Sequence, residues 1–128
     1  MARLTHRDGQ LVLSLSAIEK VAALNGDVRA PLTKVRAIRL VKPWTELRGL
    51  RSPGTAIPTA LAYGTFRWRG NRDFAAIRGG NRVLEVRLAQ GQSFARLLVT
   101  ESSPRATRRR LWCASTLARS RALFALDR

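Results

Sequence analysis

Glycine and proline divide most of the chain into short segments and are absent from its C-terminal end. All 9 glycines and all 5 prolines lie within residues 1–104, whereas residues 105–128 contain neither. The earlier segments are rich in alternating or β-branched apolar residues, which is typical of short strands separated by turns. A stretch without glycine or proline favours one continuous helix. The sequence therefore predicts a mainly β, α+β protein that ends in a single long helix.

A short strand followed by a small helix is predicted near the N-terminus. Residues 10–16 alternate apolar side chains at a period of two, which indicates a strand. Ser16 and Glu19 then stand at the spacing of a capping box, in which each side chain binds a backbone N–H of the other residue. We therefore expect one or two helical turns after Ser16, with Ile18 and Val21 on the apolar side of the helix.

The middle of the chain predicts two strands and then a long loop. The stretch 27–42 is rich in β-branched residues, and Pro31 divides it because proline lacks the N–H that a strand interior requires. Residues 43–60 contain three further prolines and two glycines, a composition typical of an irregular surface loop. Within that loop, Trp44–Arg48 would form a short helix closed by Gly49.

A first hairpin is predicted around Gly70-Asn71, a two-residue turn signal that separates residues 61–69 from residues 72–78. This turn would place Arg69 opposite Arg72 on neighbouring strands. Alternation assigns Phe66, Trp68, Ala75 and Ile77 to the core, and it assigns Tyr63, Arg67, Arg69, Arg72, Phe74 and Arg78 to a face in solvent.

A second hairpin is predicted around Gly91-Gln92, which separates residues 82–90 from residues 93–100. In the first of these strands two sets of side chains alternate, so we expect one buried face and one wet face. The buried set is Leu84, Val86 and Leu88, and the wet set is Val83, Glu85 and Arg87.

The net charge is strongly positive. The chain has 24 lysines and arginines against 8 acidic residues, a formal charge of +16. Such a field attracts nucleic acids, anionic lipids or acidic proteins. All but three of the basic residues are arginines, which is also what the codon bias of a GC-rich genome produces. Charge alone therefore does not choose among these partners.

The first hairpin and the loop before it predict an anion-binding site, which we call the anion seat. Arginines opposed across two strands repel one another, and a phosphate or carboxylate held by forked hydrogen bonds would relieve that repulsion. The alternative is that these arginines simply extend into water. The candidate anion-binding or partner-binding residues are Arg48, Arg51, Arg67, Arg69, Arg72 and Arg78.

The C-terminal helix predicts a second basic surface. Ser103 and Pro104 fit the N-cap and the first helical position, and a thin apolar stripe at Leu111, Ala114, Ala118 and Ala122 follows. A basic helical turn binds phosphates or lipid head groups with salt-sensitive affinity. The alternative is an ordinary solvated face. The candidate residues are Arg105, Arg108, Arg109 and Arg110.

The sequence contains no constellation for catalysis or metal binding. His6 is the only histidine and lies in a polar segment that we expect to fray. Cys113 is the only cysteine, which excludes an intrachain disulfide, and we expect it to be a passive thiol. The 8 acidic residues are scattered singly, without the paired carboxylates of glycosidases or metal sites. We therefore predict a protein that is not an enzyme and uses no metal or cofactor.

Membrane insertion is not expected. The longest mostly apolar stretch, residues 11–24, is interrupted by Glu19 and Lys20 and is too short to span a bilayer. The N-terminus lacks the apolar core of a signal peptide. We expect a cytoplasmic protein that can reach the inner face of the membrane only as a peripheral partner.

Three runs of sequence carry a resemblance to a known family. The chain reads DVRAPLTKVRAIRLVKPWTELRGLRSPGTAIP, then GTFRWRGNRDFAAIRGGNRVLEVRL, then FARLLVTESSP. Over residues 10–112 it resembles small, uncharacterised actinobacterial proteins that look like bacterial pleckstrin-homology (PH)-like domains. The resemblance implies a strongly bent antiparallel barrel or sandwich of six or seven strands, capped by the C-terminal helix. It places a PH-like domain at residues 1–112 and a divergent, basic continuation of the helix at residues 113–128.

Two functions follow as hypotheses. PH-like folds serve as platforms for lipids, peptides and proteins, so the first is a non-catalytic module that binds a protein or peptide, including at an anionic membrane surface. The second is a nucleic-acid-binding protein that uses the arginine face and the basic helix.

Overall fold

The computed structural model describes residues 2–23, 26–42, 50–57, 61–68, 70–79 and 82–126. These residues form nine strands, two α-helices and one 3-10 helix. In chain order they are β1 (Arg3–Arg7), β2 (Gln10–Ser14), α1 (Ala17–Ala23), β3 (Val28–Pro31), η1 (Leu32–Lys34), β4 (Val35–Val41), β5 (Leu50–Ile57), β6 (Leu61–Trp68), β7 (Asn71–Arg78), β8 (Val83–Leu88), β9 (Arg96–Val99) and α3 (Pro104–Leu126).

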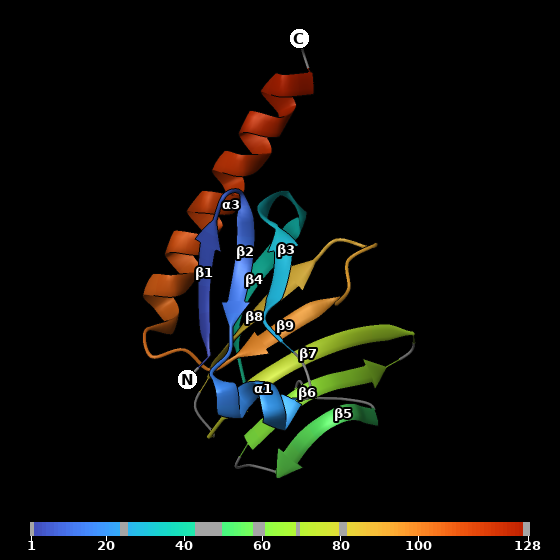
Figure 1. Ribbon diagram of the computed structural model, residues 1–128. Coiled ribbons are helices and arrows are strands. Elements are labelled where there is room, and N and C mark those ends of the chain that lie inside the picture. The colour runs from blue at the N-terminus through green and yellow to red at the C-terminus, as the bar shows by residue number, and fades with distance from the viewer. Residues whose placement is uncertain are drawn as a thin grey trace.

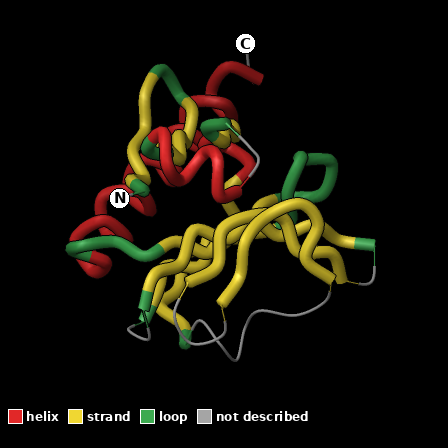
Figure 2. Tube along the Cα trace, turned by 60° about the horizontal axis from the view of Figure 1, so that its bottom comes forward, coloured by secondary structure: helices red, strands yellow, loops and turns green. Residues whose placement is uncertain are grey.

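The strands form a small sheet and a large one. Three strands pair in the order β1-β2-β3, and six pair in the order β4-β8-β9-β7-β6-β5. The small sheet and α3 lie together, while β5, β6 and β7 lie at the other end of the molecule beside α1 (Figure 1). The large sheet is bent into an arch, with the small sheet and α3 on one side of it (Figure 2). The mainly β, α+β class is confirmed.

The expected barrel or sandwich of six or seven antiparallel strands is met only in part. The described residues form nine strands in two sheets, without a closed barrel. One pair in the large sheet, β7 with β9, is parallel. β8 pairs with β4 on one side and with β9 on the other, and it is antiparallel to both. β9 therefore lies between β8 and β7.

Two strands were missed because their composition looked like loop. The N-terminal segment is β1, which pairs with β2 through a tight turn at Asp8 and Gly9, whose φ angles are 52° and 76°. The polar composition of this segment predicts fraying, but the segment pairs with β2 and its Leu4 is buried. The other missed strand, β5, lies in the predicted loop 43–60 and accommodates Pro53 at the edge of the sheet.

The ladder between β5 and β6 is irregular at that proline. Its register shifts between Arg51 and Gly54, as expected where a strand residue cannot donate a ladder hydrogen bond. The predicted short helix at Trp44–Arg48 lies outside the described residues.

Helix α1 keeps its predicted cap but presents the wrong face to the core. The capping box is formed, with Ser16 N–H donating to Glu19 Oε1 at 3.0 Å and Glu19 N–H donating to Ser16 Oγ at 3.3 Å. Ile18 and Val21, however, are 80% and 74% exposed, whereas Glu19 is buried. The expected apolar side is therefore wrong: the glutamate is turned inward, where it also accepts a hydrogen bond from Ala2 N–H at 2.9 Å.

The buried glutamate is linked to a buried tyrosine. Burial raises the pKa of Tyr63, and the nearby charge of Glu19 raises it further. For Glu19, burial raises the pKa, but hydrogen bonds with Ser16 and Tyr63 together with the N-terminal charge outweigh it and hold the pKa below its usual value. α1 is thus attached to β6 through polar groups.

The β6–β7 hairpin turns one residue earlier than predicted. Trp68 pairs with Asn71 and Arg67 pairs with Arg72, so Arg67, and not Arg69, stands opposite Arg72. The partner of Arg72 is two residues away from the predicted one. Because side chains alternate with a period of two, each side chain still lies on its expected face of the sheet. The core, however, lies mainly on the other face: Tyr63 is 4% exposed and Phe74 is fully buried.

Both faces of the large sheet carry buried apolar residues. The main cluster joins the sheet to β1, β2, η1 and α3, and it includes Leu4, Leu11, Leu13, Val35, Tyr63, Phe74, Leu84, Val86, Leu97, Val99 and Leu111. The opposite face carries a smaller cluster of Val41, Ala62, Phe66, Ala75, Ile77, Val83 and Leu98. Because the β6–β7 hairpin has core on both sides, its exposed arginines lie at the strand ends and do not form an arginine face.

The predicted wet face of β8 is wet only at Arg87, which is exposed. The hairpin register is centred on Gly91-Gln92 as predicted, but Val83 and Glu85 are fully buried. Glu85 accepts from Arg87 Nε at 2.8 Å, from Arg39 Nε at 2.9 Å and from Arg96 Nη1 at 2.8 Å. Arg96 Nε also donates to Asp73 at 2.8 Å. We call these five side chains the Glu85 network.

Helix α3 begins where predicted and docks by its N-terminal half. Thr107 N–H donates to Ser103 O at 3.0 Å, and Pro104 is the first helical residue. Leu111 is fully buried, and Ala114 and Ala118 pack against the main cluster. Ala122 is exposed, and the C-terminal turns project beyond the sheets (Figure 1). α3 runs without interruption through residues 112 and 113.

Candidate binding groove between α3 and β4

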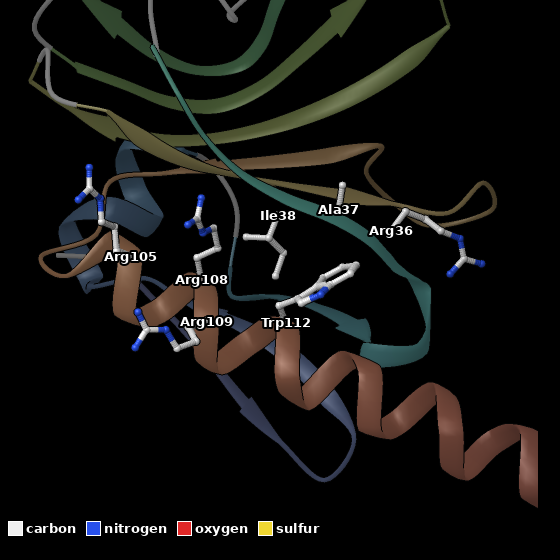
Figure 3. A pocket seen from close by; sticks show the side chains of 7 residues that line it. All are labelled: Arg36, Ala37, Ile38, Arg105, Arg108, Arg109 and Trp112. Carbon is white, nitrogen blue, oxygen red and sulfur yellow. The ribbon is translucent and has the colours of Figure 1, made fainter.

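A groove of about 350 Å³ lies between the first turns of α3 and the start of β4. On the helix, its lining residues recur three or four positions apart, so they share one face. Ile38 points from β4 toward Trp112 on α3, with Arg105 and Arg108 on one side of the indole ring and Arg36 on the other (Figure 3). The lining residues are Arg36, Ala37, Ile38, Arg105, Arg108, Arg109 and Trp112. We call this site the α3–β4 groove.

The indole of Trp112 is held in place by Arg119. The guanidinium carbon of Arg119 lies 4.8 Å from the centroid of the Trp112 ring. Trp112 is 40% exposed, so one part of the ring packs in the groove and another part meets solvent. The groove therefore has an aromatic surface that is fixed before any partner binds.

The charged residues that line the α3–β4 groove are all positive among the described residues. Four of its seven lining residues are arginines, and the described residues that line it include no aspartate or glutamate. The Arg36 side chain is steadied by a hydrogen bond from Nη1 to Thr33 O at 2.9 Å. Arginine stays protonated at any physiological pH and carries five N–H donors in a planar fork. The groove is thus suited to an anionic ligand with an apolar portion.

The predicted basic helix face is divided by the structure. Arg105, Arg108 and Arg109 line the α3–β4 groove. Arg110 instead donates from Nη2 to Leu4 O at 3.1 Å and joins α3 to β1. Arg110 therefore does not line the groove, although its side chain is exposed.

The predicted anion seat is also rearranged. Arg67 and Arg72 lie opposite each other at one end of the β6–β7 hairpin. Arg78 lies at the other end of β7, about 20 Å away for six residues of strand. Arg51 lies on β5, where it pairs with Phe66 of β6. Arg48 and Arg69 lie outside the described residues.

Several residues of these sites were missed from sequence. Trp112 stands four residues after Arg108 and three after Arg109, so helical spacing could have placed it beside them. Arg36 and Ile38 gave no signal, because only the tertiary fold brings β4 against α3. Phe94 contacts Arg72, whereas the sequence predicts it only as part of the strand 93–100.

The remaining candidates show no organised chemistry. His6 and Cys113 are both exposed. Within the described part of the chain, no group of three or more histidine, cysteine, aspartate or glutamate side chains could hold a metal ion. None of the described helices is both long enough and apolar enough to cross a bilayer. Comparison of the chain with protein-family models, with curated proteins and with solved structures finds no match.

Proposed function

We propose that this protein is a non-catalytic binding module that holds an acidic segment of a protein partner in the α3–β4 groove. The proposal depends on one observation: four arginines line the groove together with apolar Ala37, Ile38 and Trp112, and no carboxylate occurs among the described lining residues. Carboxylates match the arginine forks. An aliphatic side chain between two acidic residues of the partner would pack against Ile38 and Trp112.

The same features favour a peptide over a nucleic acid. A phosphate backbone would use the arginines of α3 but would leave the floor formed by Ala37 and Ile38 without an apolar partner. The sequence resemblance to PH-like domains supports a binding platform as well. We propose that the chain is a divergent relative of these bacterial domains and works in the cytoplasm, where it meets its partner in solution or at the anionic inner face of the membrane.

The test uses a fluorescein-labelled peptide rich in glutamate and leucine, followed by fluorescence anisotropy. The double variant Arg105→Ala/Arg108→Ala should raise the Kd by about 5- to 30-fold, because each exposed charge pair contributes about 0.5 to 1 kcal/mol. Arg29→Ala is the matched control, since Arg29 is an exposed arginine on β3, away from the groove. It should leave the Kd unchanged within error.

Competing ligands decide between the classes of partner. A peptide with glutamine in place of glutamate should bind weakly, and Trp112→Ala should weaken the glutamate–leucine peptide more than a glutamate–serine peptide. Tighter binding to random single-stranded DNA, with a steep salt dependence that Arg105→Ala/Arg108→Ala reduces, would show a nucleic-acid-binding protein instead. Binding to phosphatidylglycerol vesicles without peptide binding would show a membrane-surface role.

A further inference from the structure

Two arginines face each other at the end of the β6–β7 hairpin. Arg67 and Arg72 are direct cross-strand partners, and both are exposed. Opposed side chains on antiparallel strands begin about 4.5 to 5.5 Å apart at Cβ, so two like charges in this position repel. No hydrogen bond or ion pair joins either arginine to an acidic side chain among the described residues. Arg96, one strand away, has both Asp73 and Glu85 as partners.

Arg72 is held in position by an aromatic pair. Its guanidinium carbon lies 5.1 Å from the centroid of the Phe94 ring. Phe94 is 5% exposed and packs edge-on against fully buried Phe74, with ring centroids 5.3 Å apart and planes at 62°. The backbone is fixed too, because Ala95 N–H donates to Arg72 O at 2.6 Å. A cation–π contact leaves the N–H donors at the rim of the guanidinium available to a ligand.

A pocket of about 370 Å³ opens beside this arginine. It lies between the end of the hairpin and the loop that joins β8 to β9. The loop is anchored at its base, where Leu88 N–H donates to Ala95 O and Ala89 N–H donates to Lys34 O, at 2.9 and 2.8 Å. The polar side chains that line the pocket are Asn71, Arg72, Gln90, Gln92 and Ser93, and no carboxylate is among the described lining residues.

We propose that this pocket binds a phosphoryl group, with Arg72 as its principal contact and Arg67 as the second cation. The charge favours phosphate over carboxylate: two guanidiniums match a phosphate monoester, which carries about −1.5 to −2 at neutral pH. A phosphate bound between Arg67 and Arg72 would offset the repulsion between these two charges. The amide and hydroxyl groups of Gln90, Gln92 and Ser93 would bind the polar remainder of the ligand. This site is separate from the α3–β4 groove and does not depend on it.

The test is a titration followed by two-dimensional ¹H–¹⁵N NMR, with phenyl phosphate and inorganic phosphate as probes. Saturable shifts should appear at the amides of Asn71, Arg72 and the 90–94 loop. The double variant Arg67→Gln/Arg72→Gln should raise the Kd for phenyl phosphate by about tenfold or more. Arg29→Gln, the exposed control on β3, should bind like the unmodified protein. Arg67→Gln alone keeps the test informative if loss of Arg72 unfolds the loop, because the cation–π contact with Phe94 is made by Arg72.

The source of the phosphoryl group is decided by competition. Vesicles that contain phosphatidic acid should displace phenyl phosphate if the natural ligand is a lipid head group. Failure to displace it indicates a small soluble phosphorylated compound, and either result supports the pocket. The proposal is overturned if neither phosphate probe shifts the loop amides, or if the double variant binds phenyl phosphate as tightly as the unmodified protein does.

Discussion

Arg119 ties the aromatic floor of the α3–β4 groove to the start of β4. Its guanidinium lies over the Trp112 ring at 4.8 Å, and its Nη1 donates to Val35 O at 2.6 Å. One side chain therefore holds both the indole and the helix against the sheet. Arg119→Gln should lower the free energy of unfolding by about 1 to 2 kcal/mol, from the lost cation–π contact and the lost hydrogen bond. Urea unfolding measures this loss.

The control for Arg119 is its exposed neighbour two residues along the helix. Arg121 is exposed in the projecting part of α3, so Arg121→Gln should change stability by no more than about 0.5 kcal/mol. If both variants lose the same free energy of unfolding, the contacts of Arg119 with Trp112 and Val35 do not stabilise the protein beyond the effect of removing one positive charge.

The Glu85 network makes a second prediction. Glu85 is fully buried and accepts hydrogen bonds from three arginines. Glu85→Gln keeps the shape but removes the charge that balances Arg96, which is itself buried. Removing one member of a buried ion pair costs about 3 to 5 kcal/mol, and urea unfolding should show a loss in this range.

Asp8→Asn is the matched control for the loss of one carboxylate. Asp8 is exposed in the β1–β2 turn, and asparagine tolerates its positive φ of 52°. It should cost no more than about 0.5 kcal/mol. A loss for Glu85→Gln as small as that of the control contradicts the assigned role of the network.

Local signals in the sequence located element ends well. Ser16 and Glu19 marked a helix start, Pro31 marked a break between strands, and Ser103 with Pro104 marked the start of α3. Each of these depends on hydrogen bonds or dihedral angles within a few residues, which composition reveals. The same holds for the centre of the second hairpin at Gly91-Gln92.

Strand pairing, the burial of Glu85 and part of the candidate site depend on residues far apart in the sequence, and local sequence patterns do not predict such contacts. The sequence predicts the turn at Gly70-Asn71, and only the paired strands show that Asn71 already belongs to β7, opposite Trp68. Glu85 looked like a surface residue because its arginine partners come from β4 and β9. Of the candidate site, the α3 arginines were predictable from their spacing. The β4 side of the groove and the contact between Phe94 and Arg72 required the fold.

In helix α1 the polar Glu19 is buried and the apolar Ile18 is exposed, and mutations can test this orientation. Ile18 is 80% exposed, so Ile18→Gln should change the free energy of unfolding by no more than about 0.5 kcal/mol. Glu19→Ala removes the capping box and leaves the N–H groups of Ala2 and Ser16 without their acceptor. It should cost about 2 to 3 kcal/mol. Thermal and urea unfolding of both variants give the ranking, and a larger loss for Ile18→Gln contradicts the observed orientation.

Acid should destabilise the protein in a way that depends on Glu85. Burial alone raises the pKa of this carboxyl, but hydrogen bonds from Arg87, Arg39 and Arg96 outweigh it and hold the pKa below its usual value of 4.5. A carboxyl with a lowered folded-state pKa binds protons more weakly in the folded protein than in the unfolded chain. Its stabilisation is therefore complete above pH 4.5 and is lost as the pH falls through the folded-state pKa.

Urea unfolding over that pH range should show the stability of the unmodified protein approaching that of Glu85→Gln as the solution becomes more acidic. Protonated Glu85 and glutamine are both neutral, so the two proteins become electrostatically alike at this site. Asp8→Asn, which removes an exposed carboxylate, is the control for this comparison. A difference between Glu85→Gln and the unmodified protein that stays constant into acid would show that the charge on Glu85 does not stabilise the fold.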